Sequence, residues 1–183
     1  MIITHIDTRW DTQWPRFEVF IQEKTGAPYL DVGSVHAPDA EMALLNARDV
    51  FARRPAAISM WVVPATAIFS KTAQELKELS LEPSTDEPSR KAEPYHVFCK
   101  AKSAGTQTLQ GTVEAVSPAQ AMLRAVAAFS GEKAPFAWWV FPVRSVTQND
   151  PQDADSLYAP AHDKGFRMST DFHTHTAMRN LKK

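Results

Sequence analysis

The sequence predicts an α+β fold made of two tandem β-β-α-β repeats, with mostly antiparallel sheets packed as an internal pseudo-dimer, followed by an extended C-terminal tail. The first observation is internal similarity: a shift of 78 positions, which places Phe20 on Phe98, aligns residues 17–68 with a second copy without a gap. The second is periodicity, because each copy reads as strand, strand, helix and strand. One helix covers only one face of three strands, so we expect the copies to bury their other faces against each other.

The closing strand of each copy shows the repeat most clearly. The run "WVVP" from Trp61 aligns with "WVFP" from Trp139, and "FEVFIQEK" from Phe17 aligns with "YHVFCKAK" from Tyr95. A chance match would not keep its register through strands, helix and turns together. The chain therefore contains two copies of one unit.

The strands of the unit follow from residue type. Residues 17–22 are rich in Val, Phe and Ile, which favour strands. A second strand starts at Leu30, and Gly33 within it indicates a bulge or a close approach of the backbone to a neighbour. Residues 58–63 form the closing strand.

The helix of the unit follows the second strand. Asp39 is the expected N-cap in the first copy, while Ser117, Pro118 and Gln120 form a capping box with proline at the first helical position in the second. The expected helical face that packs on the sheet consists of Ala40, Ala43, Leu44, Ala47, Val50 and Phe51.

These elements predict five segments. They are an N-terminal extension (1–13), a first unit (14–70), a short helix and a linker rich in Pro, Ser and charge (71–93), a second, diverged unit (94–147) and a polar tail (148–183). Two interpretations of the tail stay open. It is either disordered or a strap that docks on a partner through its spaced aromatic side chains.

Composition excludes several classes of protein. The net charge is −1 without a basic stripe, which argues against a nucleic-acid partner. The N-terminus lacks the pattern of a signal peptide, and no apolar run reaches the length of a membrane span. The single cysteine, Cys99, excludes an intrachain disulfide framework and is better explained as a small buried hydrophobe. We expect a cytoplasmic, soluble protein.

No catalytic, cofactor-binding or metal-binding residues are expected in this chain. Glu93 and His96 have the Glu-x-x-His spacing of a di-iron ligand pair, but Pro94 lies between them and they run into a strand. His173 and His175 lie in the tail, where such histidines are usually solvated. Glycine-rich phosphate loops and nucleophile motifs are absent from the sequence.

The helix of the first copy carries more polar side chains than that of the second. Asn46, Arg48 and Asp49 precede the pair Arg53 and Arg54, whereas the second copy has Arg124, Val126, Ala127, Gly131 and Glu132 at these positions. This is either an ordinary solvated face or a partner-binding surface that only the first copy keeps. The planar fork of arginine suits pairing with carboxylates at such a surface.

Three stretches resemble one known family. "WPRFEVFIQEK" from Trp14, "VGSVHAPDAEMALLNARDVFARR" from Val32 and "ISMWVVPATAI" from Ile58 are similar to the phenylacetic acid degradation B (PaaB) family, the small component of the ring-1,2-phenylacetyl-CoA epoxidase. The likeness is weaker in the second copy and looser in the tail. The resemblance implies a non-catalytic subunit that bridges pairs of A-type and C-type subunits in a multicomponent monooxygenase. It places the di-iron site in the A-type subunit and none in this chain.

The resemblance also implies partner contacts, with self-association as a further possibility. The residues expected at the partner interface are Arg48, Arg53, Arg54, Trp61, Tyr158, Phe166 and Phe172. Trp61 could equally be core between the repeats. Family members consist of a single unit with a tail, so two units in one chain would alter the stoichiometry and leave the substrate open. The alternative is a stand-alone small-molecule-binding protein or enzyme with a pocket between the repeats.

Overall fold

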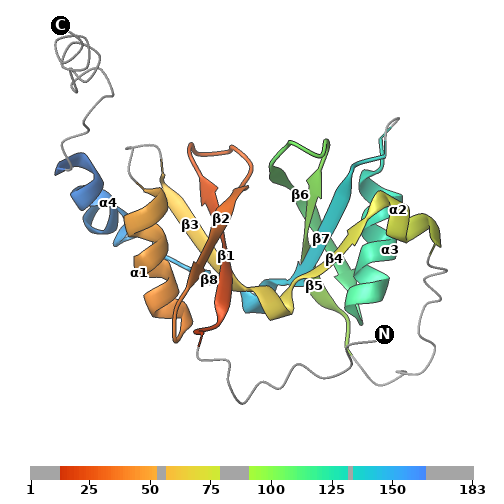
Figure 1. The fold of residues 1–183 in the computed structure, drawn as a ribbon, viewed down its shortest axis with the longest axis horizontal. Coiled ribbons are helices and arrows are strands. Elements are labelled where there is room, and N and C mark those ends of the chain that lie inside the picture. The colour runs from red at the N-terminus through yellow and green to blue at the C-terminus, as the bar shows by residue number, and fades with distance from the viewer. Residues whose placement is uncertain (1–12, 53–56, 79–90, 132–133, 164–183) are drawn as a thin grey trace, which may run out of the picture.

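The computed structural model describes residues 13–52, 57–78, 91–131 and 134–163 (Figure 1). The first repeat contains β1 (Arg16–Gln22), β2 (Leu30–His36), α1 (Ala40–Phe51) and β3 (Ser59–Pro64). The second contains β5 (Glu93–Lys100), β6 (Gln107–Ala115), α3 (Pro118–Phe129) and β7 (Ala137–Pro142). In each repeat the first strand is central and pairs antiparallel with the other two. The predicted pair of β-β-α-β repeats is confirmed.

The two helices begin where the capping residues predict. The Asp39 carboxylate accepts a hydrogen bond from the Met42 amide at 2.8 Å, and the Ser117 hydroxyl accepts one from the Gln120 amide at 3.3 Å. The Gln120 side chain reaches back to accept the Val116 amide at 3.0 Å. The first two bonds satisfy amide donors of the first helical turn, and the third ties the residue before the N-cap to the helix.

Gly33 lies at a bulge and under an aromatic ring, as the sequence suggests. The register of β1 and β2 shifts between Val19 and Phe20, and Gly33 has a φ of 127°. A Cβ at Gly33 would lie 3.1 Å from Cζ of Phe51. The second repeat repeats this packing, since a Cβ at Gly111 would lie 2.8 Å from Cζ of Phe129. The glycine therefore lets the ring at the end of each helix lie directly on the strand.

We expect Gly33→Ala to destabilise the protein by about 1–3 kcal/mol, because alanine is strained at this φ and its methyl group would press on Phe51. Urea unfolding followed by circular dichroism measures the change. Gly131→Ala is the control, since a Cβ at Gly131 meets nothing within 4 Å. Equal stabilities of the two variants would contradict this account of Gly33.

After each repeat the chain crosses to the other one. The turn η2 (Ala65–Ala67) leads to β4 (Phe69–Thr72), which pairs with β7, and to α2 (Ala73–Glu78), which packs beside α3. The turn η3 (Val143–Ser145) leads to β8 (Thr147–Gln148), which pairs with β3, and to α4 (Ala154–Asp163), which packs beside α1. The strand order is β4-β7-β5-β6-β2-β1-β3-β8. Each repeat is thus completed by a strand and a helix that follow the other.

The bounds of the five predicted segments stay a prediction. Two of them, after residues 70 and 147, fall inside the crossing strands β4 and β8. The sequence predicts the short helix after the first unit, but it does not predict the exchange of β4 and β8. The tail also starts with a helix, α4, that the sequence analysis did not include. Its side chains Ala154, Leu157 and Tyr158 pack on the core under α1.

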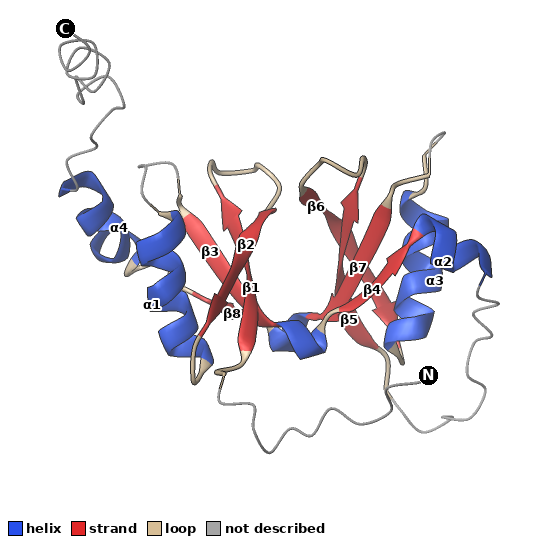
Figure 2. Cartoon of the chain, in the orientation of Figure 1, coloured by secondary structure: helices blue, strands red, loops and turns tan. Residues whose placement is uncertain are grey.

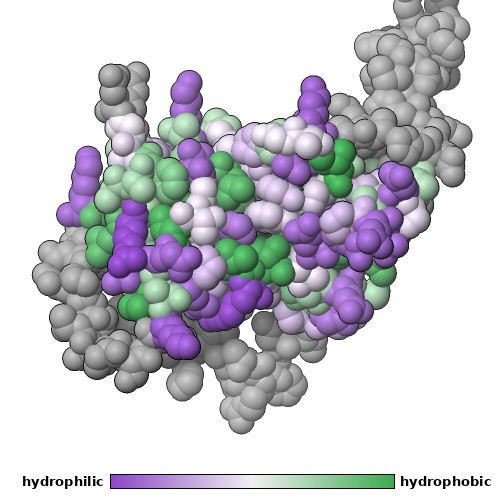
Figure 3. Space-filling model, turned by 180° about the vertical axis from the view of Figure 1, so that it is seen from behind, coloured by the Kyte–Doolittle hydropathy of each residue, from purple (hydrophilic) through white to green (hydrophobic). Residues whose placement is uncertain are grey.

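The core has three parts, and the third confirms the internal pseudo-dimer. The first cluster lies between the sheet of the first repeat and its helices, and the second lies between the sheet of the second repeat and its helices. The third lies where the halves of the sheet face each other, with the helices outside (Figure 2), and it is formed by Phe20, Tyr29, Trp61, Val63, Phe98 and Phe141. Seen from behind, a hydrophobic patch lies near the middle of the molecule, between the two halves (Figure 3).

Candidate functional site

Trp61 lies at the junction of the two repeats. Its ring stacks on Tyr29 at 3.7 Å and on His96 of the second repeat at 4.6 Å, measured between ring centroids. Its indole N–H donates to the Gln148 side chain at 3.0 Å, and the residue is buried. The structure therefore gives Trp61 the core position that the sequence left open. A contact between Trp61 and a partner stays a prediction.

His96 is the titratable member of this stack. Its ring also meets the edge of Phe141 at 5.8 Å, and its Nδ1 lies 3.4 Å from the Thr112 hydroxyl. Burial lowers the pKa of His96 below its usual value of 6.5, because the apolar surroundings disfavour the imidazolium. The folded protein therefore favours neutral His96.

We expect the protein to lose stability as the pH falls below about 6.5, because the unfolded chain then binds a proton that folded His96 resists. The stability that neutral His96 contributes is fully present above this pH, and it is lost as the pH falls towards the lower pKa of the folded state. Urea unfolding of the wild type, His96→Gln and His96→Phe between about pH 7.5 and about pH 5.5 tests this. The wild type should lose stability relative to both variants. Parallel curves for all three proteins would contradict it.

Glu18 occupies the position of the first repeat that corresponds to His96. Burial raises the pKa of Glu18, against the opposing effect of the Arg16 guanidinium 3.1 Å away, and the Asp31 carboxylate raises it further. Burial also raises the pKa of Asp31, whose carboxylate accepts the Gly33 amide at 3.0 Å. Glu18 was not among the residues predicted from the sequence. The available signal was its place between two apolar residues of a strand that the repeat buries on both faces.

Arg48 lines an open groove of about 430 Å³ between α1 and α4, together with Leu44, Asn149, Asp150, Asp153, Ser156 and Leu157. Its guanidinium is half-buried and bonds to the Asp49 carboxylate at 3.0 and 3.1 Å. The groove is polar, and the carboxylates of Asp150 and Asp153 also line it. Arg48 thus faces the chain's own α4, and a partner contact at Arg48 stays a prediction.

Tyr158 is held inside the chain by a small polar network. Its hydroxyl donates to the Asn149 side-chain oxygen at 3.2 Å, and the same oxygen accepts the Met60 amide at 2.8 Å. Burial raises the pKa of Tyr158 to about 12, so the hydroxyl remains a donor. Tyr158 therefore anchors α4 on the first repeat, and its contact with a partner stays a prediction. Asn149, which the sequence analysis missed, continues the pairing of β3 beyond β8.

Four of the residues expected at the partner interface lie outside the described part of the chain. They are Arg53, Arg54, Phe166 and Phe172, and their roles stay predictions.

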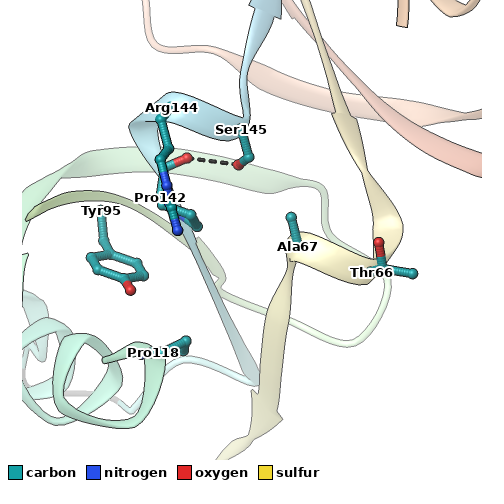
Figure 4. Close-up of a pocket in the computed structure, with 7 residues that line it drawn as sticks. All are labelled: Thr66, Ala67, Tyr95, Pro118, Pro142, Arg144 and Ser145. Atoms are coloured by element: carbon teal, nitrogen blue, oxygen red, sulfur yellow. Dashed lines mark hydrogen bonds between the residues drawn. The ribbon is translucent and has the colours of Figure 1, made fainter. Parts of the chain in front are cut away.

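A second hollow, of about 440 Å³, lies where the crossing turns meet the second repeat (Figure 4). Its lining residues are Thr66, Ala67, Tyr95, Pro118, Pro142, Arg144 and Ser145. The Arg144 guanidinium pairs with the Glu93 carboxylate at 3.0 Å, and the Tyr95 hydroxyl donates to the same carboxylate at 3.2 Å. The Ser145 hydroxyl donates to the Pro142 carbonyl at 2.6 Å. These polar groups are engaged with one another.

The described residues include no group of three His, Cys, Asp or Glu side chains that could hold a metal ion. Glu93 and His96 lie in β5, as expected, and not on a helix. Burial raises the pKa of the Cys99 thiol, which disfavours the thiolate. Within the same residues, no helix has the length and apolar character to cross a membrane.

Comparisons with known proteins agree with the internal repeat. A profile described as phenylacetic acid degradation B matches residues 13–97 and matches again over residues 91–179. The chain is also similar to the B component of the 1,2-phenylacetyl-CoA epoxidase of Escherichia coli strain K12, with 46% identity over 65 residues, which are 36% of this chain and 68% of that protein. No solved structure matches.

Proposed function

Because the chain belongs to the phenylacetic acid degradation B family, we propose that it is a non-catalytic bridging subunit of a bacterial multicomponent di-iron monooxygenase in phenylacetate catabolism. The observation that carries this proposal is the double family match, with the similarity to the B component of an epoxidase. We further propose that the chain acts in the cytoplasm.

The arrangement of the repeats supports a bridging role. Helices α1 and α3 lie on opposite outer sides of one body, and β4 and β8 tie the two repeats together (Figure 1). A bridge needs outward faces held at a fixed distance, because a loose connection would not orient two larger partners. The aromatic packing between the repeats does not favour the alternative of a ligand pocket there.

The proposed partners are an A-type subunit and a C-type subunit. In this proposal the A-type subunit holds the di-iron centre, which supplies the oxygen chemistry, and this chain binds no cofactor. The buried Trp61 and Tyr158 then act indirectly, by holding the repeats and α4 in place.

Native mass spectrometry with iron analysis tests the proposal on the tagged full chain purified from its own host. We expect it to co-purify with two helical subunits and about two irons per A-type chain. The masses would then show how many A-type chains one doubled unit binds. A chain that is recovered alone and free of iron under gentle, low-salt conditions would contradict the bridging role.

A further inference from the structure

The hollow of about 440 Å³ lies where both crossing turns meet the second repeat, and we call it the Arg144 hollow. Thr66 and Ala67 of η2 form one wall, Tyr95 and Pro118 of the second repeat form the opposite wall, and Arg144 of η3 lies between them (Figure 4). Its volume is in the range of sites that hold a small ligand or a partner's side chain. A group that enters it therefore contacts both crossing turns and the second repeat at once.

The first repeat is an internal comparison for this hollow, because the shift of 78 positions gives the equivalent of each lining residue. Thr66 takes the place of Arg144, and Phe17 takes the place of Tyr95. The first repeat has the same strands and helix as the second without this guanidinium and this hydroxyl. The fold of the unit therefore does not require these two polar groups.

The carboxylate beside the hollow also has no charged counterpart. The Ala37 amide donates to the Pro15 carbonyl at 3.1 Å, and Ala115, the equivalent of Ala37, lies opposite Glu93 in the register of β5 and β6. Pro15 is thus the equivalent of Glu93. The ion pair of Arg144 and Glu93 belongs to the second repeat alone.

A chain of two hydrogen bonds holds the guanidinium in place. Tyr95 is 2% exposed, and its hydroxyl donates to one carboxylate oxygen of Glu93 at 3.2 Å. The other carboxylate oxygen accepts a bond from Nη1 of Arg144 at 3.0 Å. The interior of the repeat thus fixes Glu93, and Glu93 orients Arg144. A group that is oriented in advance loses less conformational entropy when a partner binds.

Arg144 keeps further donors for a second acceptor. Its side chain is 58% exposed, and within the part of the chain that the structure describes its only hydrogen bond from a side-chain nitrogen goes to Glu93. The N–H groups on Nε and Nη2 remain for a partner. No other cation lines the hollow, and Pro118 has no amide hydrogen to donate. Arg144 is therefore the group that would select what enters.

The charges indicate which acceptor fits. The planar fork of arginine pairs with carboxylates and phosphates through two parallel hydrogen bonds. Glu93 already neutralises part of the charge of Arg144, and its carboxylate repels an incoming anion. A singly charged carboxylate can share the guanidinium with Glu93, whereas a doubly charged phosphate meets more repulsion and finds no second cation. The arrangement therefore favours a carboxylate.

We propose that the Arg144 hollow binds an aspartate or glutamate side chain of a partner subunit, so that each chain has one such site and not two. The inference rests on the proposed function and adds to it a contact point and its chemistry. The site is single because the equivalent place in the first repeat has Thr66 and no cation. A contact at the junction also touches both crossing turns, which the outer helices do not offer.

The test measures the dissociation constant of the full chain for the purified A-type and C-type subunits of the same host. Arg144→Thr gives η3 the residue that η2 has at the equivalent place, so the fold should tolerate it. We expect this variant to weaken binding of one subunit at least about tenfold, as the loss of an interface arginine does.

Arg16→Thr is the matched control. Arg16 is 56% exposed, pairs with the single carboxylate of Glu18 and lies in the first repeat, so the variant removes the same charge elsewhere. It should bind as the wild type does. Melting curves verify that each variant is folded.

Two further variants test the chemistry of the occupant. Arg144→Lys keeps the charge but loses the fork, so its affinity should lie between those of the wild type and Arg144→Thr. Arg144→Glu should bind more weakly than Arg144→Thr at about 50 mM salt, and this difference should shrink at about 300 mM because salt screens exposed charges. Binding of Arg144→Glu as tight as that of Arg144→Thr, or tighter, would overturn the carboxylate as the occupant.

The remaining outcomes separate this inference from the proposed function. If the wild type binds and Arg144→Thr binds equally well, the hollow is not the contact, while the bridging role stands. An equal loss of binding in Arg16→Thr would mean a general attraction between charges and would overturn the site. If light scattering shows that Arg144→Thr abolishes self-association of the chain, a second copy occupies the hollow and the inference is wrong. If the wild type binds neither subunit, both proposals fail.

Discussion

Two fragments of this chain, residues 1–84 and 85–183, are expected to reach the folded state only when they are together. The first fragment carries β4 and α2, which complete the second repeat, and the second carries β8 and α4, which complete the first. Apart, each fragment exposes Phe20 or Phe98 and their neighbours, which the joined chain buries completely. Apolar surface of this size drives association.

Co-expression with a tag on one fragment measures the effect. The untagged fragment should co-purify in equal amount, and the mixture should have the circular dichroism spectrum of the intact chain. Each fragment alone should either lack a cooperative unfolding transition or pair with itself. A single fragment that unfolds cooperatively as a monomer would show that the exchange is dispensable.

We expect Phe20→Ala to have the largest effect of any single substitution considered. Phe20 is fully buried between the repeats, with its ring centroid 4.5 Å from that of Phe98 and 5.5 Å from that of Phe141. Truncation would leave a cavity that these rings cannot fill, at a cost of about 3–5 kcal/mol. This is a large part of the stability of an ordinary domain.

Urea unfolding and thermal melting measure this loss. A chain of this size loses about 2–4 °C of Tm for each kcal/mol. Phe136→Ala removes the same side chain from an exposed position and should change stability by only about 0.5 kcal/mol. Similar losses in the two variants would mean that the inter-repeat cluster is not a tightly packed core.

The fold inside each repeat was predictable because local patterns encode it. The Val, Phe and Ile content of residues 17–22, the cap at Asp39 and the glycine at position 33 each act within a few residues, and the second copy repeats them. The exchange was not predictable in this way. The strand β4 has four residues and pairs with β7, far away in the sequence, and no short-range pattern distinguishes this pairing from a turn.

The candidate site was harder to predict because it depends on what covers each side chain. Tyr158 looks like a free aromatic in a polar tail, yet Asn149 and α1 bury it. Among the described residues, the same helix covers one side of α1 and leaves Met42 and Val50 exposed. The arginines were predicted at the interface because of their charge. The difference in exposed apolar side chains between the repeats can be recognised only when the exposure of each residue is known.

The join between the repeats has a consequence for how this protein can change. In a pair of identical chains every substitution occurs twice, at both symmetry-related places, so an improvement in one place is tied to its effect in the other. Here positions 18 and 96 already hold a buried glutamate and a half-buried histidine at corresponding places. A single gene thereby supplies what would otherwise need two diverged genes, in a fixed one-to-one ratio that dilution cannot disturb.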